Sequence, residues 1–287
     1  MRDQHGDSRA ASARAVPAAR VASPAVPEPS DLDARAHANL CDFTRFLARL
    51  EPGADLVDAE GVVAVIGGAD FPTARTAVRA NDTLPPRDWA RRVAALLAAR
   101  GQTGNVFARV GRDDDVTDEL AAHGYREWAQ TPEMICEHRL EPREPPPGVT
   151  VRFARTPGDV AAYATIAGRA FTHLAIPEAT TRDTINNAGV MLGDDCVIAL
   201  ADLDGVPVAG ALVVLFAGSS DGYVGWVSCV DEARGRGLGD TVTRAVTNEA
   251  FVRGAGIVTL EASHFGEHTY ARMGYRETYR YRILIKV

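Results

Sequence analysis

One tetrapeptide, Gly-Tyr-Arg-Glu, occurs twice in this chain of 287 residues, at residues 124–127 and 274–277, so its copies lie 274 − 124 = 150 residues apart. The same predicted elements precede each copy. A helix and a strand are predicted at residues 86–100 and 105–110 in the first half and at residues 238–253 and 257–262 in the second, each pair followed by a short helix. Four identical residues could coincide by chance, but the shared order favours an internal duplication. The repeat therefore predicts two copies of one α/β unit.

The second half alternates between extended and helical patterns. An extended run at residues 149–154 leads into a helix that begins at Pro157, and a second helix is predicted at residues 177–192. Strands are predicted at residues 196–203, 206–216, 223–230 and 275–287, with Asp204-Gly205 as a hairpin signal between the first two and a short helix at residues 266–273 before the last. This order predicts a mixed α/β domain.

Two segments of unusual composition divide the chain. Residues 1–30, rich in Ala, Arg, Pro and Ser, are predicted to be a disordered tail, and they lack the continuous apolar segment of a secretory signal. Residues 141–148, Glu-Pro-Arg-Glu-Pro-Pro-Pro-Gly, are the best linker candidate because three consecutive prolines hold an extended conformation. The expected domains are therefore residues 31–140 and residues 149–287.

Composition limits the partners of the protein. The net charge of −7 and the lack of a Lys/Arg cluster argue against nucleic acid and suit an amine-bearing substrate better. No apolar run approaches the ~18 residues of a membrane span, so no membrane association is expected. Cys41, Cys136, Cys196 and Cys229 have neither metal-type nor redox-type spacing, so we expect reduced thiols, no bound metal and a cytoplasmic location. The oligomeric state stays open.

A glycine-rich segment separates the strand at residues 223–230 from the helix that follows. It reads Arg234, Gly235, Arg236, Gly237, Leu238, Gly239 and Asp240. Glycines at a strand-to-helix turn let the backbone approach a phosphate, toward which the amides and the helix N-terminus then point. A P-loop lysine is missing, and the glycine spacing argues against a dinucleotide-dependent oxidoreductase. A flexible loop with two solvated arginines is the non-functional alternative.

The segment from Arg234 to Gly239 resembles the Arg/Gln-x-x-Gly-x-Gly/Ala acyl-CoA signature of the GNAT superfamily of N-acetyltransferases. Residues 260–275 are similar to the downstream motif of that family, with Tyr270 four residues before its Gly-Tyr pair. Ser263 stands at the Asn position of that motif and Gly266 at its Ala position, so two landmarks differ. The likeness covers residues 149–287 and implies the GNAT fold, an α/β fold with a mixed sheet, in two tandem copies.

The resemblance implies acetyl-CoA as co-substrate, bound in a gap where two neighbouring strands splay apart. The pantetheine arm would pair with the backbone of Val227, Ser228, Cys229 and Val230, and the pyrophosphate would bind the amides of residues 234–240, with Ser263 assigned to the same site. Tyr270 takes the position of the general acid that protonates the leaving thiolate. The structural alternatives are a tyrosine packed in the core and an Arg234 side chain that only caps carbonyls.

The general base is not defined by the sequence. The strand at residues 223–230, where the family often carries a glutamate, contains none, although the amine must lose a proton before it reacts. Glu261 is the first candidate, and the others, each also explained as an ordinary surface or hydrogen-bonded group, are Asp221, Asp231, Glu232 and His264. Cys229 is expected to be a small buried residue rather than a nucleophile because no histidine partner is evident.

The first half lacks the glycine loop. Its corresponding segment, residues 78–87, contains no glycine, and Pro85 and Pro86 have no N–H to donate. This half resembles the degenerate partner in tandem acetyltransferases, so we expect it to bind no CoA and to pack against the second half or shape the acceptor pocket. Deletion of residues 1–145 is then expected to leave CoA binding intact.

These observations predict an N-acetyltransferase that transfers an acetyl group from acetyl-CoA to a small-molecule or peptide amine by direct attack. The alternative is a non-catalytic acyl-CoA sensor that uses the same loop without chemistry. The sequence leaves the acceptor and the acyl chain length open.

Overall fold

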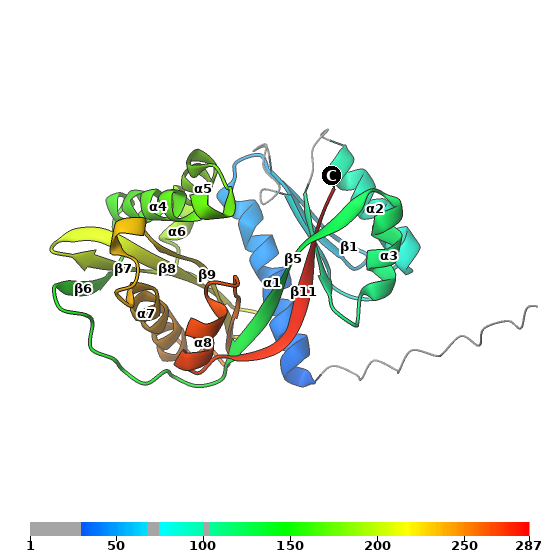
Figure 1. The fold of residues 1–287 in the computed structure, drawn as a ribbon. Helices are drawn as coiled ribbons and strands as arrows, with labels where there is room; N and C mark the ends of the chain where they lie inside the picture. The colour runs from blue at the N-terminus through cyan, green and yellow to red at the C-terminus, as the bar shows by residue number, and fades with distance from the viewer. Residues whose placement is uncertain (1–29, 68–74, 100–103, 287) are drawn as a thin grey trace, which may run out of the picture.

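A computed structural model describes residues 30–67, 75–99 and 104–286 (Figure 1). The helices are α1 (Asp31–Leu50), α2 (Pro86–Ala98), α3 (Asp114–Ala122), α4 (Pro157–Phe171), α5 (Glu178–Ile185), α6 (Ala188–Met191), α7 (Leu238–Val252) and α8 (Glu267–Met273), with 3-10 turns η2 (Thr172–Leu174) and η3 (Asp231–Ala233). The strands are β1 (Asp55–Ala59), β2 (Val62–Ile66), β3 (Arg75–Arg79), β4 (Asn105–Arg109), β5 (Tyr125–Cys136), β6 (Val149–Phe153), β7 (Cys196–Leu203), β8 (Val206–Phe216), β9 (Asp221–Cys229), β10 (Val258–Glu261) and β11 (Arg276–Lys286). The tail expected at residues 1–30 lies outside the described residues except for Ser30, the N-cap of α1.

The described strands form one continuous sheet in the order β1-β2-β3-β4-β11-β5-β10-β9-β8-β7-β6. The two halves exchange one strand each at its centre. β11, from the end of the chain, lies between β4 and β5, and β5, from the first half, lies between β11 and β10 (Figure 1). These pairings are all antiparallel. Each half therefore completes its sheet with a strand of the other half.

The register of β5 and β11 reflects the internal repeat. Their ladder runs from Arg276 opposite Ile135 to Lys286 opposite Tyr125. Near its middle Thr131 faces Tyr281, and 281 − 131 = 150, the same separation as that of the two Gly-Tyr-Arg-Glu copies. The two strands that follow these copies thus face each other at equivalent residues, as a local two-fold axis requires.

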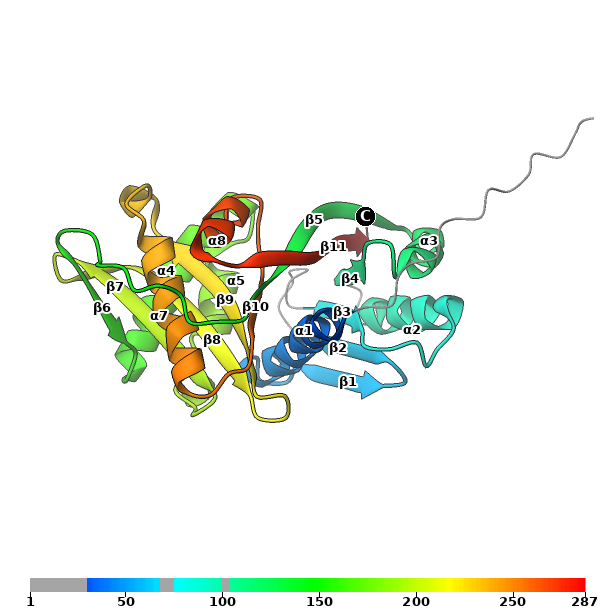
Figure 2. The same cartoon turned by 90° about the horizontal axis from the view of Figure 1, so that it is seen from below.

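Helix α1 lies between the two halves and contacts both (Figure 2). Toward the second half, Phe43 stacks on Tyr223 with ring centroids 4.4 Å apart. The guanidinium group of Arg35 forms an ion pair with the buried carboxylate of Asp221 at 2.5 Å. Toward the first half, the helix packs on β2 and β3. Because α1 holds strands on both sides of the exchange, it fixes the halves against each other.

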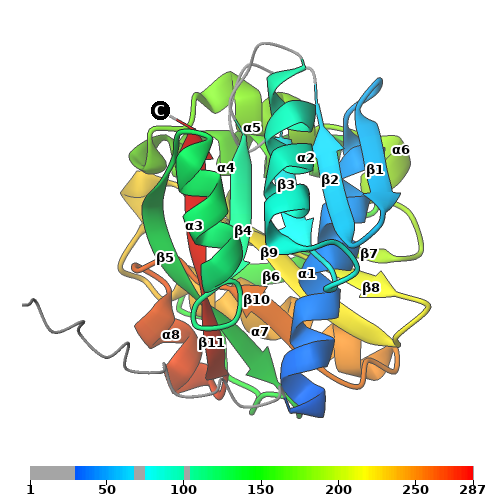
Figure 3. The ribbon, with the colours of Figure 1, turned by 90° about the vertical axis from the view of Figure 1, so that its right-hand side faces the viewer.

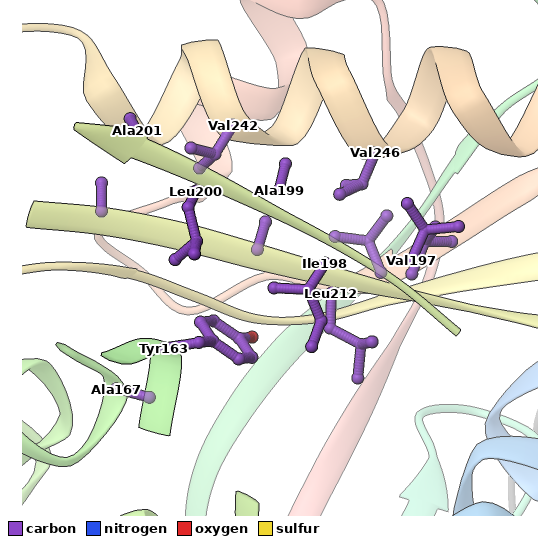
Figure 4. Close-up of a cluster of buried hydrophobic side chains, with 14 of the residues drawn as sticks. Tyr163, Ala167, Val197, Ile198, Ala199, Leu200, Ala201, Leu212, Val242 and Val246 are labelled. Carbon is purple, nitrogen blue, oxygen red and sulfur yellow. The ribbon is translucent and has the colours of Figure 1, made fainter. Parts of the chain in front are cut away.

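Helices cover both faces of the sheet. Figure 3 looks onto α2 and α3, which pack on one face of the first-half strands, whereas α1 packs on the other. In the second half, Val242 and Val246 of α7 point onto one face of β7 and β8, and Tyr163 of α4 lies on the opposite face (Figure 4). Strands covered on both faces need apolar residues at successive positions, which explains the uninterrupted burial of residues 196–202 in β7.

Local predictions agree with most of these elements. The strands expected at residues 196–203 and 206–216 are β7 and β8, and Asp204 and Gly205 between them have φ values of 52° and 82°, as a tight hairpin requires. The single helix expected at residues 177–192 is wrong, because the chain breaks between α5 and α6. There the Asn187 side chain accepts a hydrogen bond from the Val190 amide and donates one to the Leu50 carbonyl.

The proline-rich segment at residues 141–148 contains neither helix nor strand. Arg244 of α7 donates a hydrogen bond to the Glu141 carbonyl at 3.0 Å, and Asn248 exchanges two hydrogen bonds with the Leu140 backbone. The start of this segment therefore runs along α7. Among the described residues, no helix has the length and apolar character needed to cross a membrane.

Deletion of residues 1–145 removes α1 and β5, so the strand order gives a different expectation from the sequence. The remaining fragment would expose the edges of β10 and β11, and we expect it to aggregate or stay unfolded in circular dichroism and size-exclusion chromatography. Co-expression with residues 1–140 should restore a soluble complex because β5 is then supplied in trans. A folded, monomeric fragment 146–287 would show that the strand exchange is dispensable.

Candidate active site

Two neighbouring strands separate at the end of β10. β9 and β10 run parallel and pair only at Gly222 with Val258 and at Tyr223 with Thr259. β10 ends at Glu261, whereas β9 continues to Cys229 with its other edge on β8. From residue 224 onward, the edge of β9 that faces β10 has no strand partner in the described part of the chain. A gap of this kind is what the family resemblance implies.

A β-bulge shapes the open strand. Trp226 has a φ of 46°, and its carbonyl accepts hydrogen bonds from the Tyr163 hydroxyl at 2.9 Å and from the Ser228 hydroxyl at 2.7 Å. The Val230 amide donates to Val208 of β8. The residues assigned to the pantetheine arm, Val227, Ser228, Cys229 and Val230, therefore follow the bulge along the splayed edge.

The glycine-rich segment makes the turn from β9 into α7. Gly235 and Gly237 both have φ of 78°, so backbone conformation calls for glycine at these positions. Gly237 is the N-cap of α7, and no side chain caps this end of the helix. The six successive amides of residues 235–240 donate to no group among the described residues. Free amides at a helix N-terminus form an anion-binding site.

The Arg234 side chain fixes the loop to the end of α4. Its guanidinium group donates to the carbonyls of Ala170 at 3.2 Å and Cys229 at 3.4 Å, and it forms an ion pair with Asp231 at 2.9 Å. The structure therefore agrees with the alternative in which Arg234 caps carbonyls.

The other residues of the loop differ in burial and in their contacts. Leu238 is buried and anchors the start of α7, while Arg236 is exposed. A Cβ at Gly239 would lie 3.9 Å from Val227, so the helix start and the open strand are close together. Asp240 is held by Arg244 at 2.7 Å. Its carboxylate is thereby neutralised beside the free amides.

Tyr270 on α8 is partly buried against the second-half core. Its ring is in edge contact with Tyr275, and a Cβ at Gly266 would lie 2.6 Å from it, which explains why glycine replaces alanine in this motif. Burial raises the pKa of Tyr270 above its ordinary value, so the hydroxyl stays protonated at neutral pH. The Ser263 carbonyl accepts hydrogen bonds from the Gly266 and Glu267 amides and so supports the start of α8.

Only one of the five candidate bases lies at the splay. The remaining four, Asp221, Asp231, Glu232 and His264, contact Arg35, Arg234, Arg169 and Phe265 respectively. Glu261 is the last residue of β10 and lies two residues beyond Thr259, which makes the final pair with β9. Burial raises the pKa of Glu261 to about 7. A carboxyl with this pKa can exchange protons at neutral pH.

A second carboxyl group, which sequence reasoning missed, lies opposite the first. Glu133 of β5 is the Cα partner of Glu261 and is fully buried, with Thr259 beside its carboxyl group. Burial first, and then the charge of Glu261, raise the pKa of Glu133 well above its ordinary value. The local signal was one acid directly before the apolar residues Met134, Ile135 and Cys136. Glu261 is 261 − 133 = 128 residues away along the chain, so the sequence pattern could not predict that the two carboxyl groups are paired.

Cys229 is half-buried at the end of β9, and burial raises the pKa of its thiol. This shift disfavours the thiolate that a nucleophile needs. In the described ranges, no three His, Cys, Asp or Glu side chains form a group of the kind that holds a metal ion.

The corresponding turn of the first half is filled by a side chain. β3 ends at Arg79, close to the end of its pairing with β4, so no long open edge follows. The Arg79 guanidinium group lies among Asp82, Asp113 and the Leu84 carbonyl. Pro85 is the N-cap of α2 and has no amide hydrogen. These features give a physical reason for the expectation that this half binds no CoA.

Replacement of Glu133 by Gln should stabilise the protein more at pH 8 than at pH 5. Burial raises the pKa of this carboxyl in the folded protein above its value of ~4.3 in the unfolded chain, so the unfolded chain binds fewer protons above that pH and wild-type stability falls as pH rises. Gln does not titrate, and the expected gain is about 1–3 kcal/mol at pH 8. Thermal melts at both pH values test this, with exposed Glu127→Gln on the same strand as the control. A pH-independent difference would contradict the burial of an ionisable Glu133.

Neither a protein-family model nor a curated protein sequence matches the chain. Solved structures do: a GCN5-related N-acetyltransferase from Kribbella flavida aligns with a TM-score of 0.66 and 23% identity over 88% of this chain and 95% of its own. One from Sphaerobacter thermophilus aligns at 0.57 and 20% identity over 90% and 93%. A tandem GNAT protein from the clavulanic acid biosynthesis pathway aligns at 0.56 and 14% identity over 91% and 97%. The chain therefore has the fold of the GCN5-related N-acetyltransferases, in agreement with the α/β fold expected from its sequence.

Proposed function

We propose that the protein is an N-acetyltransferase that moves an acetyl group from acetyl-CoA to an amine. The observation that carries the proposal is the splayed gap between β9 and β10, followed by six free amides at the start of α7. Tyr270 on α8 and Glu261 at the end of β10 supply an acid and a base for this chemistry. The shared fold supports the same reaction class.

Two features of the gap support acetyl-CoA as the co-substrate. An extended pantetheine arm can add to the open edge of β9 as a further strand would. The pyrophosphate can accept hydrogen bonds from the amides of residues 235–240, and charge-assisted bonds of this kind contribute about 1.5–3 kcal/mol each. Several such bonds bind the anion without a lysine. Bound there, acetyl-CoA supplies an activated thioester.

The transfer then requires two proton movements. Glu261 accepts a proton from the acceptor ammonium group, and the neutral nitrogen attacks the thioester carbonyl. A C–N bond forms and the C–S bond breaks, while Tyr270 donates its proton to the leaving sulfur. The nitrogen loses its second proton to restore Tyr270, so each turnover releases one proton to solvent from Glu261.

Tyr270→Phe should lower kcat by about 10²-fold and leave acetyl-CoA affinity almost unchanged, because the hydroxyl acts on the leaving group. Thiol release with a panel of amines measures the rate, and calorimetry measures acetyl-CoA binding. Tyr275→Phe is the matched control: it removes a core hydrogen bond to Thr247 and should lower stability rather than kcat. An unchanged rate in Tyr270→Phe would remove its role as acid. Binding of acetyl-CoA without thiol release from any amine would favour the sensor function.

The rate should also follow the ionisation of Glu261. With its pKa raised to about 7, kcat/KM should increase between about pH 6 and about pH 8 as the carboxyl loses its proton. Glu261→Gln should lower kcat/KM and abolish its rise between about pH 6 and about pH 8. The remaining pH dependence should then reflect only the ionisation of the amine. Glu249→Gln on α7 serves as the control. If Glu261→Gln and wild type have the same profile, the base lies elsewhere.

A further inference from the structure

A cavity of about 240 Å³ lies at the corner of the second half where β6 and β7 cease to pair. β6 pairs with β7 only as far as Phe153 opposite Ala199, while β7 begins 199 − 196 = 3 residues earlier, at Cys196. The cavity occupies this corner, between the end of β6, the turn before β7 and Arg253 at the end of α7. Its volume is that of about eight water molecules in the liquid, which is enough for a molecule of the size of an amino acid.

Hydrogen bonds hold the walls of this cavity in place. The Cys196 amide donates to the Gly193 carbonyl at 3.0 Å, which closes the turn before β7. The Arg253 guanidinium group donates to the Asp194 carbonyl at 3.2 Å and so joins the end of α7 to the same turn. The cavity is therefore formed by ordered parts of the chain, and a ligand does not need to create it.

Two opposite charges that line the cavity have no partner. The side chains of Arg155 and Asp194 form no ion pair and no hydrogen bond with any described residue, and they do not pair with each other. Arg253, the third charged residue of the lining, is already bound to Glu249 at 2.9 Å. One free cation and one free anion at the same cavity suit a ligand that carries both charges.

Part of the lining is apolar. Met191, Val197 and Ile198 line the cavity and are buried in the second-half core. Cys196 lies beside them, and burial raises the pKa of its thiol to about 12, so this group stays neutral. An apolar side chain of a ligand would lose its contact with water against these residues, which favours binding.

The cavity and the candidate active site lie at opposite ends of α7. The free amides precede Leu238 at the start of this helix, whereas Arg253 follows its last residue, and 15 helical residues span about 22 Å. In the sheet, Cys196 is aligned through Val214 of β8 with Tyr223, near the start of β9 rather than on its open edge. A ligand in the cavity therefore leaves the splayed gap free.

We propose that this cavity binds a free α-amino acid with a short apolar side chain. The ligand carboxylate lies on Arg155 and its ammonium group on Asp194, while its side chain packs on Met191 and Val197. A simple carboxylate would leave Asp194 unpaired, and a simple amine would leave Arg155 unpaired, so the zwitterion is the ligand that matches both charges. This site goes beyond the proposed function and does not depend on acetyl transfer.

Titration calorimetry of the full-length chain with leucine tests the proposal. Isocaproate is leucine without its ammonium group, and isopentylamine is leucine without its carboxylate. We expect saturable binding of leucine and binding at least about tenfold weaker for either analogue, because each lacks one charged contact. Arg155→Gln and Asp194→Asn should each weaken leucine binding by about tenfold. Exposed Arg87→Gln on α2, in the first half, should keep wild-type affinity.

Two further measurements locate the site. Ala154→Leu places a larger side chain in the cavity without changing any charge, and it should abolish leucine binding. Saturating acetyl-CoA should leave the leucine affinity unchanged, because the cavity lies away from the gap. Thermal melts confirm that each variant is folded.

The inference would be overturned by a lack of leucine binding, by equal binding of leucine and either analogue, or by wild-type affinity in Arg155→Gln or Asp194→Asn. Competition between leucine and acetyl-CoA would also overturn it, since it would place leucine in the gap. The proposed function is tested separately by thiol release. Leucine binding that depends on Arg155 and Asp194 in a protein without acetyltransferase activity would support the cavity and reject acetyl transfer alone.

Discussion

The antiparallel pairing of β5 with β11 is the interaction on which the rest of the structure depends. It joins the two halves through their exchanged strands, and each half lacks an inner strand of its sheet without it. The pairing places Thr131 opposite Tyr281, which is its equivalent in the repeat. The two exchanged strands are therefore paired at equivalent residues of the two halves. Helix α1 then covers the junction, with Arg35 and Phe43 bound to β9. The sheet is therefore one hydrogen-bonded unit rather than two separate ones.

The exchange also brings the two halves together beside the open edge of β9. The second half supplies that edge and the free amides at α7, while the first half supplies β5, which lies next to β10. In the first half the equivalent positions are closed, because Arg79 fills the turn and Arg109 pairs with Asp113. Of the described residues, the glycine turn with free amides at a helix start lies in the second half. The other copy contributes through the strand that it donates.

Sequence reasoning succeeded where neighbours along the chain decide the conformation. The hairpin at Asp204 and the start of α7 at Leu238 depend on turn residues and local periodicity, and both were predicted. The break between α5 and α6 was not, because Asn187 stabilises it through the distant Leu50 carbonyl. The base could not be selected from sequence either. Glu261 was the first of five candidates, four acids and one histidine, and its position at the end of β10 and its raised pKa are what the structure adds.

By itself the sequence determined which half carries the glycine turn and most of the order of helices and strands in the second half. Positive φ at Gly235 and Gly237 and apolar periodicity are properties of adjacent residues. Only the tertiary structure decided that β5 is inserted beside β10 of the second half and β11 beside β4 of the first half. The same holds for the pairing of Glu133 with Glu261. The physical reason is that strand pairing joins any two compatible edges, however far apart in the chain. Which edges remain open is known only when the whole sheet has formed.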